Sequence, residues 1–229
     1  IGNFGCQTYV EPKQRMITIH RFVDGTKQEI SVDDLLKLSP TDTLDGMVWV
    51  DLFQPTAQEE ERLLQQWLQV SVLALEDARQ AIPDLEDVHH PKVDDLGNCL
   101  YVILRGATIP KDRSGMDAVS VLQNTSAGQL NVFINHSFLV THRWRDMGVV
   151  RRVVSTYAAN PELSKRGPDY AVAIMMGMII DDVYDITELV EERLLYFETA
   201  ALKSDTADVV QRLLKHRRRI FLMRRATTY

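Results

Sequence analysis

The sequence predicts an α/β fold in which the strands come first and the longest helices come last. Apolar runs separated by turn signals fill the first half of the 229-residue chain, and helical spacing dominates the second half. The strands follow one another with short turns, which favours a mixed, largely antiparallel sheet. Hydrophobic residues make up 45% and charged residues 25% of the chain, which excludes intrinsic disorder.

Short apolar runs mark the predicted strands, which span residues 15–23, 27–30, 47–52, 99–107, 116–124, 129–134 and 137–142. Asp24-Gly25 is a turn signal that predicts a hairpin between the first two runs. Asn135-His136 provides the corresponding turn between the last two. We expect these strands to form one sheet.

Two helices are predicted between the strands. Thr56 and Glu59 have the spacing of a capping box, which begins a helix that runs to about Leu68. The buried stripe expected for this helix consists of Leu63, Leu64, Trp67 and Leu68. A second helix is predicted over residues 72–80, and Pro83 and Pro91 bound the loop that follows it.

The second half is predicted to be helical throughout. One helix spans residues 146–159, a short one restarts at Asn160-Pro161, and a long one runs from Asp169 to about Leu202. Residues 204–206 interrupt the chain before a last helix over 206–228. We therefore divide the chain into an α/β part (1–165), a long acidic helix packed on it (166–203) and the beginning of a further helix (204–229).

Several classes of protein are excluded by what the sequence lacks. Cys6 and Cys99 are far apart, which argues against a zinc ribbon or a disulfide framework. The longest apolar run, residues 171–180, is too short to cross a bilayer. The motifs GxGxxG, GxxxxGK[ST], GxSxG and HExxH are absent, so we do not expect an enzyme.

The charge of the chain is unevenly distributed. Residues 211–229 contain seven Lys and Arg residues and no acid, whereas the whole chain has a net charge of −6. A basic segment of this kind suits nucleic acid, an anionic membrane surface, an acidic patch on a partner, or simply a solvated helix face. The sequence alone leaves these alternatives open.

Two acidic pairs are candidate metal ligands. Asp181-Asp182 interrupts an apolar helix and begins an acidic ridge, which is either a solvated helix face or a site for a hard cation such as Mg²⁺ or Ca²⁺. Glu76-Asp77 ends an apolar helix, and Glu86-Asp87 and His89-His90 follow in one loop. This second cluster is either an exposed polar loop or a site for a divalent transition ion.

Five segments in order resemble the cytoplasmic domain of CorA-type divalent-cation transporters. They are VWVDLFQPTAQEEERLLQQW, VLALEDARQ, HHPKVDDLGNCLYVILRG, LNVFINHSFLVTHR and DYAVAIMMGMIIDDVYDITELVEERLLYFE. The segment VVQRLLKHRRRIFLMRR is similar to the beginning of the family's long stalk helix. The likeness covers nearly the whole chain from about residue 15.

The resemblance implies an α/β/α sandwich with a mixed sheet between helix layers, followed by long helices that lead to the membrane. It also implies a homopentamer attached through membrane helices with a Gly-Met-Asn signature at the pore. Gly-Met occurs here at 46–47, 115–116 and 177–178 but is never followed by Asn, so we expect the pore to lie outside this chain. The expected location is the cytoplasmic face of the inner membrane, and the expected partners are further copies and the membrane rather than nucleic acid.

The resemblance further implies a regulatory Mg²⁺ ion bound between neighbouring subunits. Glu76 and Asp77 correspond to the family's acidic pair, and with Asp181 and Asp182 they are the predicted metal ligands. Co²⁺ or Zn²⁺ are alternatives to Mg²⁺. Gly177 stands where many members carry an Asp one turn before the second pair, so a complete second site is not expected.

The leading hypothesis is therefore the cytosolic ion-sensing, regulatory domain of a CorA-like magnesium or cobalt transporter, an ion channel whose pore is not part of this chain. The alternatives are the cytoplasmic domain of a related zinc transporter and a stand-alone α/β scaffold that binds a partner through its helices. Asp77 is expected to be the most consequential acid. We expect Leu73 and Leu75 to anchor its helix while Asp77 projects at the edge.

Overall fold

The computed structural model describes residues 16–24, 26–79, 91–108, 110, 115–116, 120–121, 125–201, 211, 213, 214, 217 and 220. Within them, seven strands form one sheet in the order β2-β1-β3-β7-β6-β5-β4. Their bounds are β1 Met16–Val23, β2 Thr26–Glu29, β3 Met47–Phe53, β4 Lys92–Asp95, β5 Leu100–Thr108, β6 Ser126–Ile134 and β7 Phe138–Arg143. All neighbouring pairs are antiparallel except β3 and β7, which confirms the mixed, largely antiparallel sheet.

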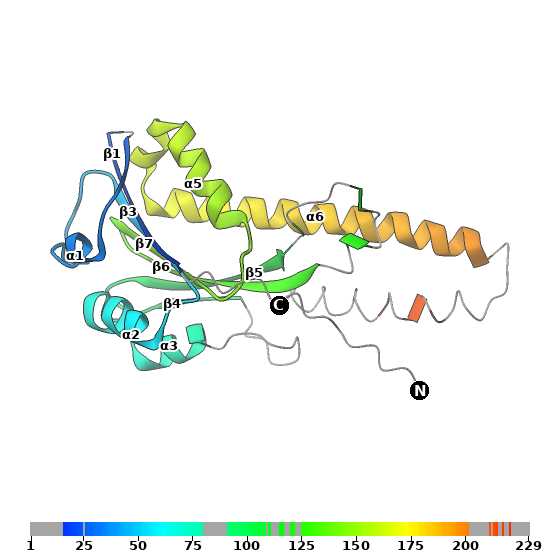
Figure 1. Cartoon of the computed structure of the whole chain (residues 1–229), viewed down its shortest axis with the longest axis horizontal. Helices are drawn as coiled ribbons and strands as arrows, with labels where there is room; N and C mark the ends of the chain where they lie inside the picture. Colours follow the sequence, from blue (N-terminus) through cyan, green and yellow to red (C-terminus); the bar gives the residue numbers. More distant parts are fainter. Residues whose placement is uncertain are drawn as a thin grey trace.

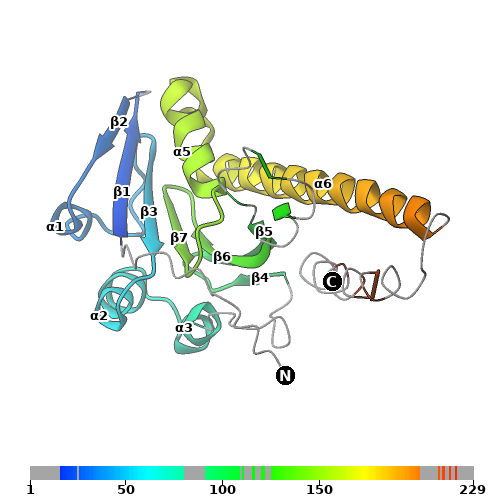
Figure 2. The same ribbon diagram turned by 45° about the vertical axis from the view of Figure 1, so that its right-hand side comes forward.

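The two strands at the centre of the sheet are buried on both faces. All six residues of β7 are buried, and in β3 only Phe53 is partly exposed. Neither sequence alternates between apolar and polar residues: β3 reads MVWVDLF and β7 reads FLVTHR, as expected where both faces of a strand are covered. Figure 2 shows helices on either side of these strands.

Three short helices pack on one face of the sheet: α1 (Val32–Leu35), α2 (Ala57–Glu60) and α3 (Val72–Arg79). Helix α2 continues directly into a π-helix, Glu61–Trp67. Thr56 Oγ1 accepts the backbone N–H of Glu59 at 3.2 Å and Glu59 Oε2 accepts that of Thr56 at 2.6 Å, which confirms the capping box. The predicted stripe of Leu63, Leu64, Trp67 and Leu68 is buried in this layer.

The other face carries α5 (Val149–Ala159), a 3-10 helix (Pro161–Arg166) and α6 (Pro168–Ala201). Helix α6 crosses β5 at Gly106, where a Cβ atom would lie 2.8 Å from Ile179 Cγ2. The missing side chain therefore allows the helix to approach the strand closely. Together the two faces confirm the α/β/α layering (Figure 1).

Helix α6 continues well past the sheet (Figure 1). Its 34 residues confirm the long helix predicted from Asp169 to about Leu202. At 1.5 Å per residue it measures roughly 50 Å. The described residues of the last predicted helix, 211, 213, 214, 217 and 220, are helical, and the remainder of 206–228 lies outside the described residues. The division at residues 165 and 203 stays a prediction.

Among the described residues, no helix combines the length and the apolar composition needed to span a bilayer.

The strand predicted over residues 116–124 is wrong where it can be checked. Ser120 and Val121 are helical, and the buried Val121 offers its carbonyl to Thr125 Oγ1 at 2.9 Å. Short apolar runs have no period long enough to separate a helix from a strand. Residues 117–119 and 122–124 lie outside the described part of the chain.

Two elements were not expected from the sequence. Strand β4 has the sequence KVDD, and helix α1 is only four residues long. β4 is short and charged and therefore has no apolar run from which a strand could be predicted; in the described part of the chain it is an edge strand of the sheet. Its existence depends on pairing with β5.

Candidate ion site on helices α3 and α6

Helix α3, which carries Glu76 and Asp77, lies on the sheet through small side chains. Ala74, Leu75 and Ala78 are buried, whereas Leu73 is 71% exposed. The prediction that Leu73 helps to anchor this helix is therefore wrong, and Leu75 alone of the two leucines is in the core. With so little apolar surface buried, polar contacts carry more of the attachment of α3.

The C-terminal turn of α3 is held by side-chain donors from β6 and from the residue that follows β7. The carbonyl of Ala78 accepts from Asn131 Nδ2 at 3.3 Å and from Trp144 Nε1 at 3.2 Å. The last carbonyls of a helix have no intrahelical partner, so donors from neighbouring elements satisfy them. Arg79 Nε also donates to Glu60 Oε2 at 2.6 Å. These contacts fix the position of the acidic pair that precedes them.

Asp77 is engaged in an ion pair. Lys92 Nζ lies 2.7 Å from Asp77 Oδ2 and also 2.7 Å from Asp94 Oδ2. The Asp77 side chain is only 14% exposed, and the ammonium group lies 5.6 Å from the centre of the Tyr101 ring. Hydrogen bonds to the two carboxylates raise the pKa of Lys92 above its ordinary value. Glu76, by contrast, is exposed.

A buried polar network lies beneath α3 on the same face of the sheet. Asn131 Oδ1 accepts from the Tyr101 hydroxyl at 2.9 Å and from Gln129 Nε2 at 2.8 Å. Asn131 Nδ2 therefore faces His142 Nδ1, 3.3 Å away, as a donor. His142 Nδ1 must then accept, so the proton resides on Nε2, which donates to Glu60 Oε1 at 2.8 Å.

Glu60 remains ionised inside this network. Burial by itself would raise the pKa of Glu60, but hydrogen bonds from His142 and Arg79 outweigh burial and hold it below its ordinary value. The sequence gives no indication of this network, because its residues come from α2, α3, β5, β6 and β7. In the sequence Glu60 is the middle one of three consecutive acids, Glu59, Glu60 and Glu61, and nothing local marks it as the buried one.

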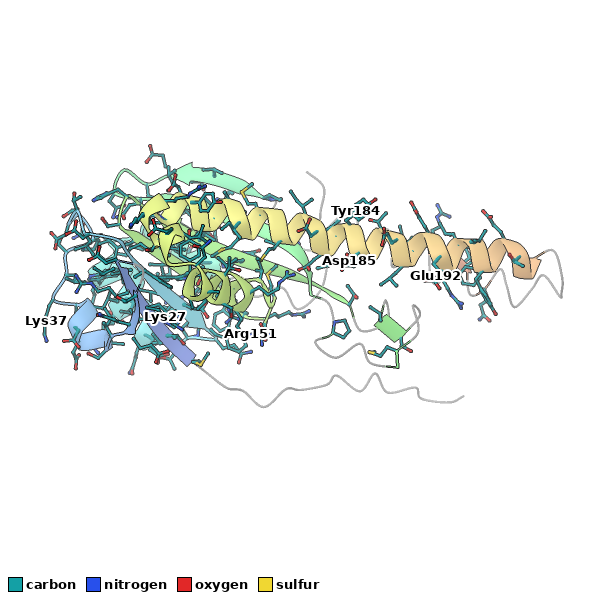
Figure 3. The ribbon with its side chains drawn as sticks, turned by 90° about the horizontal axis from the view of Figure 1, so that it is seen from above. Lys27, Lys37, Arg151, Tyr184, Asp185 and Glu192 are labelled. Carbon is teal, nitrogen blue, oxygen red and sulfur yellow. The ribbon has the colours of Figure 1, made fainter. Side chains whose placement is uncertain are left out.

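The second acidic pair is divided between two environments. Asp182 is 15% exposed and accepts from Arg152 Nη2 of α5 at 2.5 Å, which ties α5 to α6. Asp181 is exposed and begins a stripe with Asp185, Glu188 and Glu192 at helical spacing. Figure 3 shows Asp185 and Glu192 along one edge of α6, with Tyr184 on the opposite edge.

The structure does not bring the four predicted ligands together. Glu76 and Asp77 lie on α3, on one face of the sheet, and Asp181 and Asp182 lie on α6, on the other (Figure 1). Across the described residues, no group of three or more His, Cys, Asp or Glu side chains is arranged to hold a metal ion. Within one chain the four acids therefore do not fit a shared Mg²⁺ ion. Glu86-Asp87 and His89-His90 lie outside the described residues.

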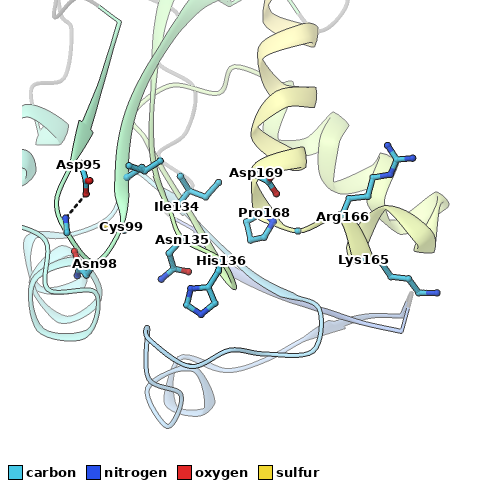
Figure 4. A pocket seen from close by; sticks show the side chains of 13 residues that line it. Asp95, Asn98, Cys99, Ile134, Asn135, His136, Lys165, Arg166, Pro168 and Asp169 are labelled. Carbon is cyan, nitrogen blue, oxygen red and sulfur yellow. Dashed lines mark hydrogen bonds between the residues drawn. The ribbon is translucent and has the colours of Figure 1, made fainter.

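A cavity of about 620 Å³ opens where two turns of the sheet meet the beginning of α6 (Figure 4). Its polar side chains are mostly engaged in holding loops. Asp95 Oδ1 accepts from Gly97 N at 2.8 Å, and Asn98 Nδ2 donates to the Leu68 carbonyl at 2.6 Å. Burial raises the pKa of the Cys99 thiol to about 11, which makes it a poor nucleophile. The residues that line this cavity therefore do not form a recognisable group of catalytic side chains.

The layered α/β/α fold, with a long acidic helix extending from it, is the class of domain seen in the soluble part of CorA proteins. The family model described as "CorA-like Mg2+ transporter protein" matches residues 45–229. The chain belongs to this family, which is one of transporters rather than enzymes. The resemblance found in the sequence is thereby confirmed.

Individual relatives are distant. The soluble domain of CorA from Methanocaldococcus jannaschii has a TM-score of 0.65 at 17% identity, covering 92% of this chain and 74% of that one. The ZntB cytoplasmic domain from Vibrio parahaemolyticus has a TM-score of 0.60 at 11% identity, covering 92% of this chain and 73% of that one. YfjQ of Bacillus subtilis (strain 168), which is named as a metal ion transporter, is 22% identical over 201 residues. This match covers 83% of the chain but spans only 57% of the length of YfjQ.

Proposed function

We propose that this chain is the regulatory domain of a divalent-cation transporter, that it lies on the cytosolic side of the membrane, and that it works in an assembly of several copies. Membership of the CorA-like family over residues 45–229 supports the transporter assignment. The chain spans 57% of YfjQ, so the transport activity of the whole protein is itself part of the proposal.

The observation that carries the proposal is the placement of α6. Its first half is a layer of the domain, with Ala171, Met175 and Ile179 buried against the sheet. In the described part of its second half, only Ile186 and Phe197 are buried. A continuous helix that is fixed to the domain at one end moves with it as a rigid body. A rotation of the domain therefore displaces the far end of α6 and any element that packs against that end.

The proposed signal for this movement is Mg²⁺, with Co²⁺ or Zn²⁺ as alternatives. Carboxylate oxygens are the ligands that Mg²⁺ prefers, and Glu76 and Asp181 offer exposed carboxylates. Across the described residues no three such side chains converge at either position, so we propose that a neighbouring copy supplies further ligands. Cys99 and His142 carry groups that Zn²⁺ prefers but are buried in the core, whereas His136 is exposed.

The test is ion flux through the complete protein reconstituted in lipid vesicles. Uptake of Mg²⁺, Co²⁺ and Zn²⁺ is measured separately with an ion-sensitive dye, and protein-free vesicles serve as the control. We expect flux of Mg²⁺ and Co²⁺, reduced when Mg²⁺ is present on the side that carries this domain. Flux of Zn²⁺ alone would favour the zinc transporter. Absence of any divalent flux would contradict the proposal and leave the scaffold hypothesis.

A further inference from the structure

We propose that Lys92 is the counter-ion of Asp77 in this chain, and that Asp77 docks α3 on the edge of the sheet instead of binding a divalent cation. The inference deepens the proposed function and rests on it, because it removes one of the four predicted ligands from the ion response. Its basis is the ammonium group of Lys92, which is shared at 2.7 Å by Asp77 and Asp94.

The environment of Asp77 suits an ammonium group better than a hydrated metal ion. Mg²⁺ loses its water shell reluctantly and binds through only a few protein carboxylates, so it needs an open approach. The Asp77 side chain is 14% exposed and the Lys92 side chain 35%. Lys92 belongs to β4 of the same chain, so its ammonium group neutralises Asp77 without a cation from solution.

Lys92 also prevents a repulsion within the chain. Asp77 and Asp94 both direct an oxygen towards the same ammonium group, and without it two like charges would face each other in a partly buried place. The contact of Lys92 with the Tyr101 ring, 5.6 Å from its centre, adds a second attraction for the positive charge.

The pair connects two peripheral elements of the domain. Helix α3 has eight residues and buries only Ala74, Leu75 and Ala78, while Val72 and Leu73 face solvent. Strand β4 has four residues and, among the described residues, pairs with β5 alone. The Asp77–Lys92 contact therefore ties α3 directly to β4, in addition to the contacts of Ala78 and Arg79 at the end of the helix.

The first experiment is a double-mutant cycle with Asp77→Asn and Lys92→Met, read by thermal unfolding in buffer without divalent cations. Both replacements preserve the size of the side chain. We expect each single change to lower Tm, and the double change to lower it no further than the more damaging single one. Strictly additive losses would overturn the pairing. The exposed pair Asp33–Arg62, 2.9 Å apart, is the matched control, and Asp33→Asn with Arg62→Met is expected to show additive, small effects.

The second experiment measures the rise in Tm produced by MgCl₂ against NaCl of equal ionic strength, in wild type and in Asp77→Asn. A ligand that binds only the folded state raises the free energy of unfolding by RT ln(1 + [L]/Kd), so a variant that loses the site loses the rise in Tm. We expect the same rise in both proteins. Loss of the wild-type rise in Asp77→Asn would overturn the inference. The flux measurement tests the proposed function separately. If the complete protein transports no divalent cation, the proposed function fails. The coupling between Asp77 and Lys92 is still decided by the double-mutant cycle.

Discussion

His142 Nε2 donates to Glu60 Oε1 over 2.8 Å, although the two residues are 82 positions apart and their side chains are 0% and 3% exposed. The contact joins the central strand β7 to the last residue of α2. Arg79, at the end of α3, donates to the other carboxylate oxygen of Glu60 at 2.6 Å. Glu60 is thus the point where two helices of one layer meet the sheet.

Replacing Glu60 with alanine is expected to destabilise the fold by about 3 kcal/mol, because it leaves a buried N–H of His142 without an acceptor and removes the carboxylate that pairs with the partly exposed Arg79. Urea unfolding followed by circular dichroism measures the change. Glu61→Ala, at the exposed neighbouring position, is the control and should change the free energy of unfolding by no more than ~0.5 kcal/mol. An equal loss of unfolding free energy in the two variants would show that the buried contacts of Glu60 do not stabilise the fold.

The same residue gives the stability a dependence on pH. The pKa of Glu60 is lower in the folded than in the unfolded chain, so its ionised form favours folding. This contribution is complete above the unfolded value of about 4.3 and is lost as the pH falls through the lower folded value. We expect the stability gap between wild type and Glu60→Gln to shrink over the range in which the pH is lowered through and below the unfolded value of about 4.3. A gap that stays constant over this range, measured by urea unfolding, would contradict the depressed pKa.

Gly106 and Gly177 are expected to respond to alanine in opposite directions. A Cβ at Gly106 would lie 2.8 Å from Ile179 Cγ2, so Gly106→Ala should push α6 away from β5 and cost about 1–3 kcal/mol. At Gly177, no atom lies within 4 Å of such a Cβ, and the residue is exposed in the middle of α6. Gly177→Ala should therefore stabilise the helix by about 0.5–1 kcal/mol. Thermal unfolding of both variants tests the pair, and destabilisation by Gly177→Ala would show that its surface is covered.

Arg152 and Asp182 are expected to couple α5 to α6 with a modest, salt-sensitive energy. The pair is 2.5 Å apart and partly exposed, so a double-mutant cycle with Arg152→Met and Asp182→Asn should give about 0.5–1 kcal/mol at low salt. The coupling should fall on addition of 1 M NaCl, where the screening length is about 3 Å. Asp181→Asn, at the exposed neighbour, should show no coupling to Arg152. A coupling energy that salt leaves unchanged would show that Asp182 and Arg152 stabilise each other by packing rather than by charge.

Features that depend on neighbouring residues were accessible from the sequence. The capping box joins Thr56 to Glu59 over three positions, the β6–β7 hairpin turns at Asn135-His136, and the spacing of apolar residues predicts α6 almost to its ends. Each is stabilised by contacts a few residues apart, so a local pattern is enough to predict it. The sequence also suffices to place the chain in its family.

What connects distant segments was decided only by the tertiary structure. The parallel pairing of β3 with β7, the short edge strand β4 and the contact of Glu60 with His142 each join residues from separate elements. The same is true of Asp77: its position beside Glu76 suggests an available ligand, whereas in the folded chain Lys92, 15 positions later, donates to its carboxylate. The spacing of residues along the chain indicates which side chains share a helix face. The partner of a buried charge depends instead on how the layers pack, because desolvation penalises a buried charge that has no partner.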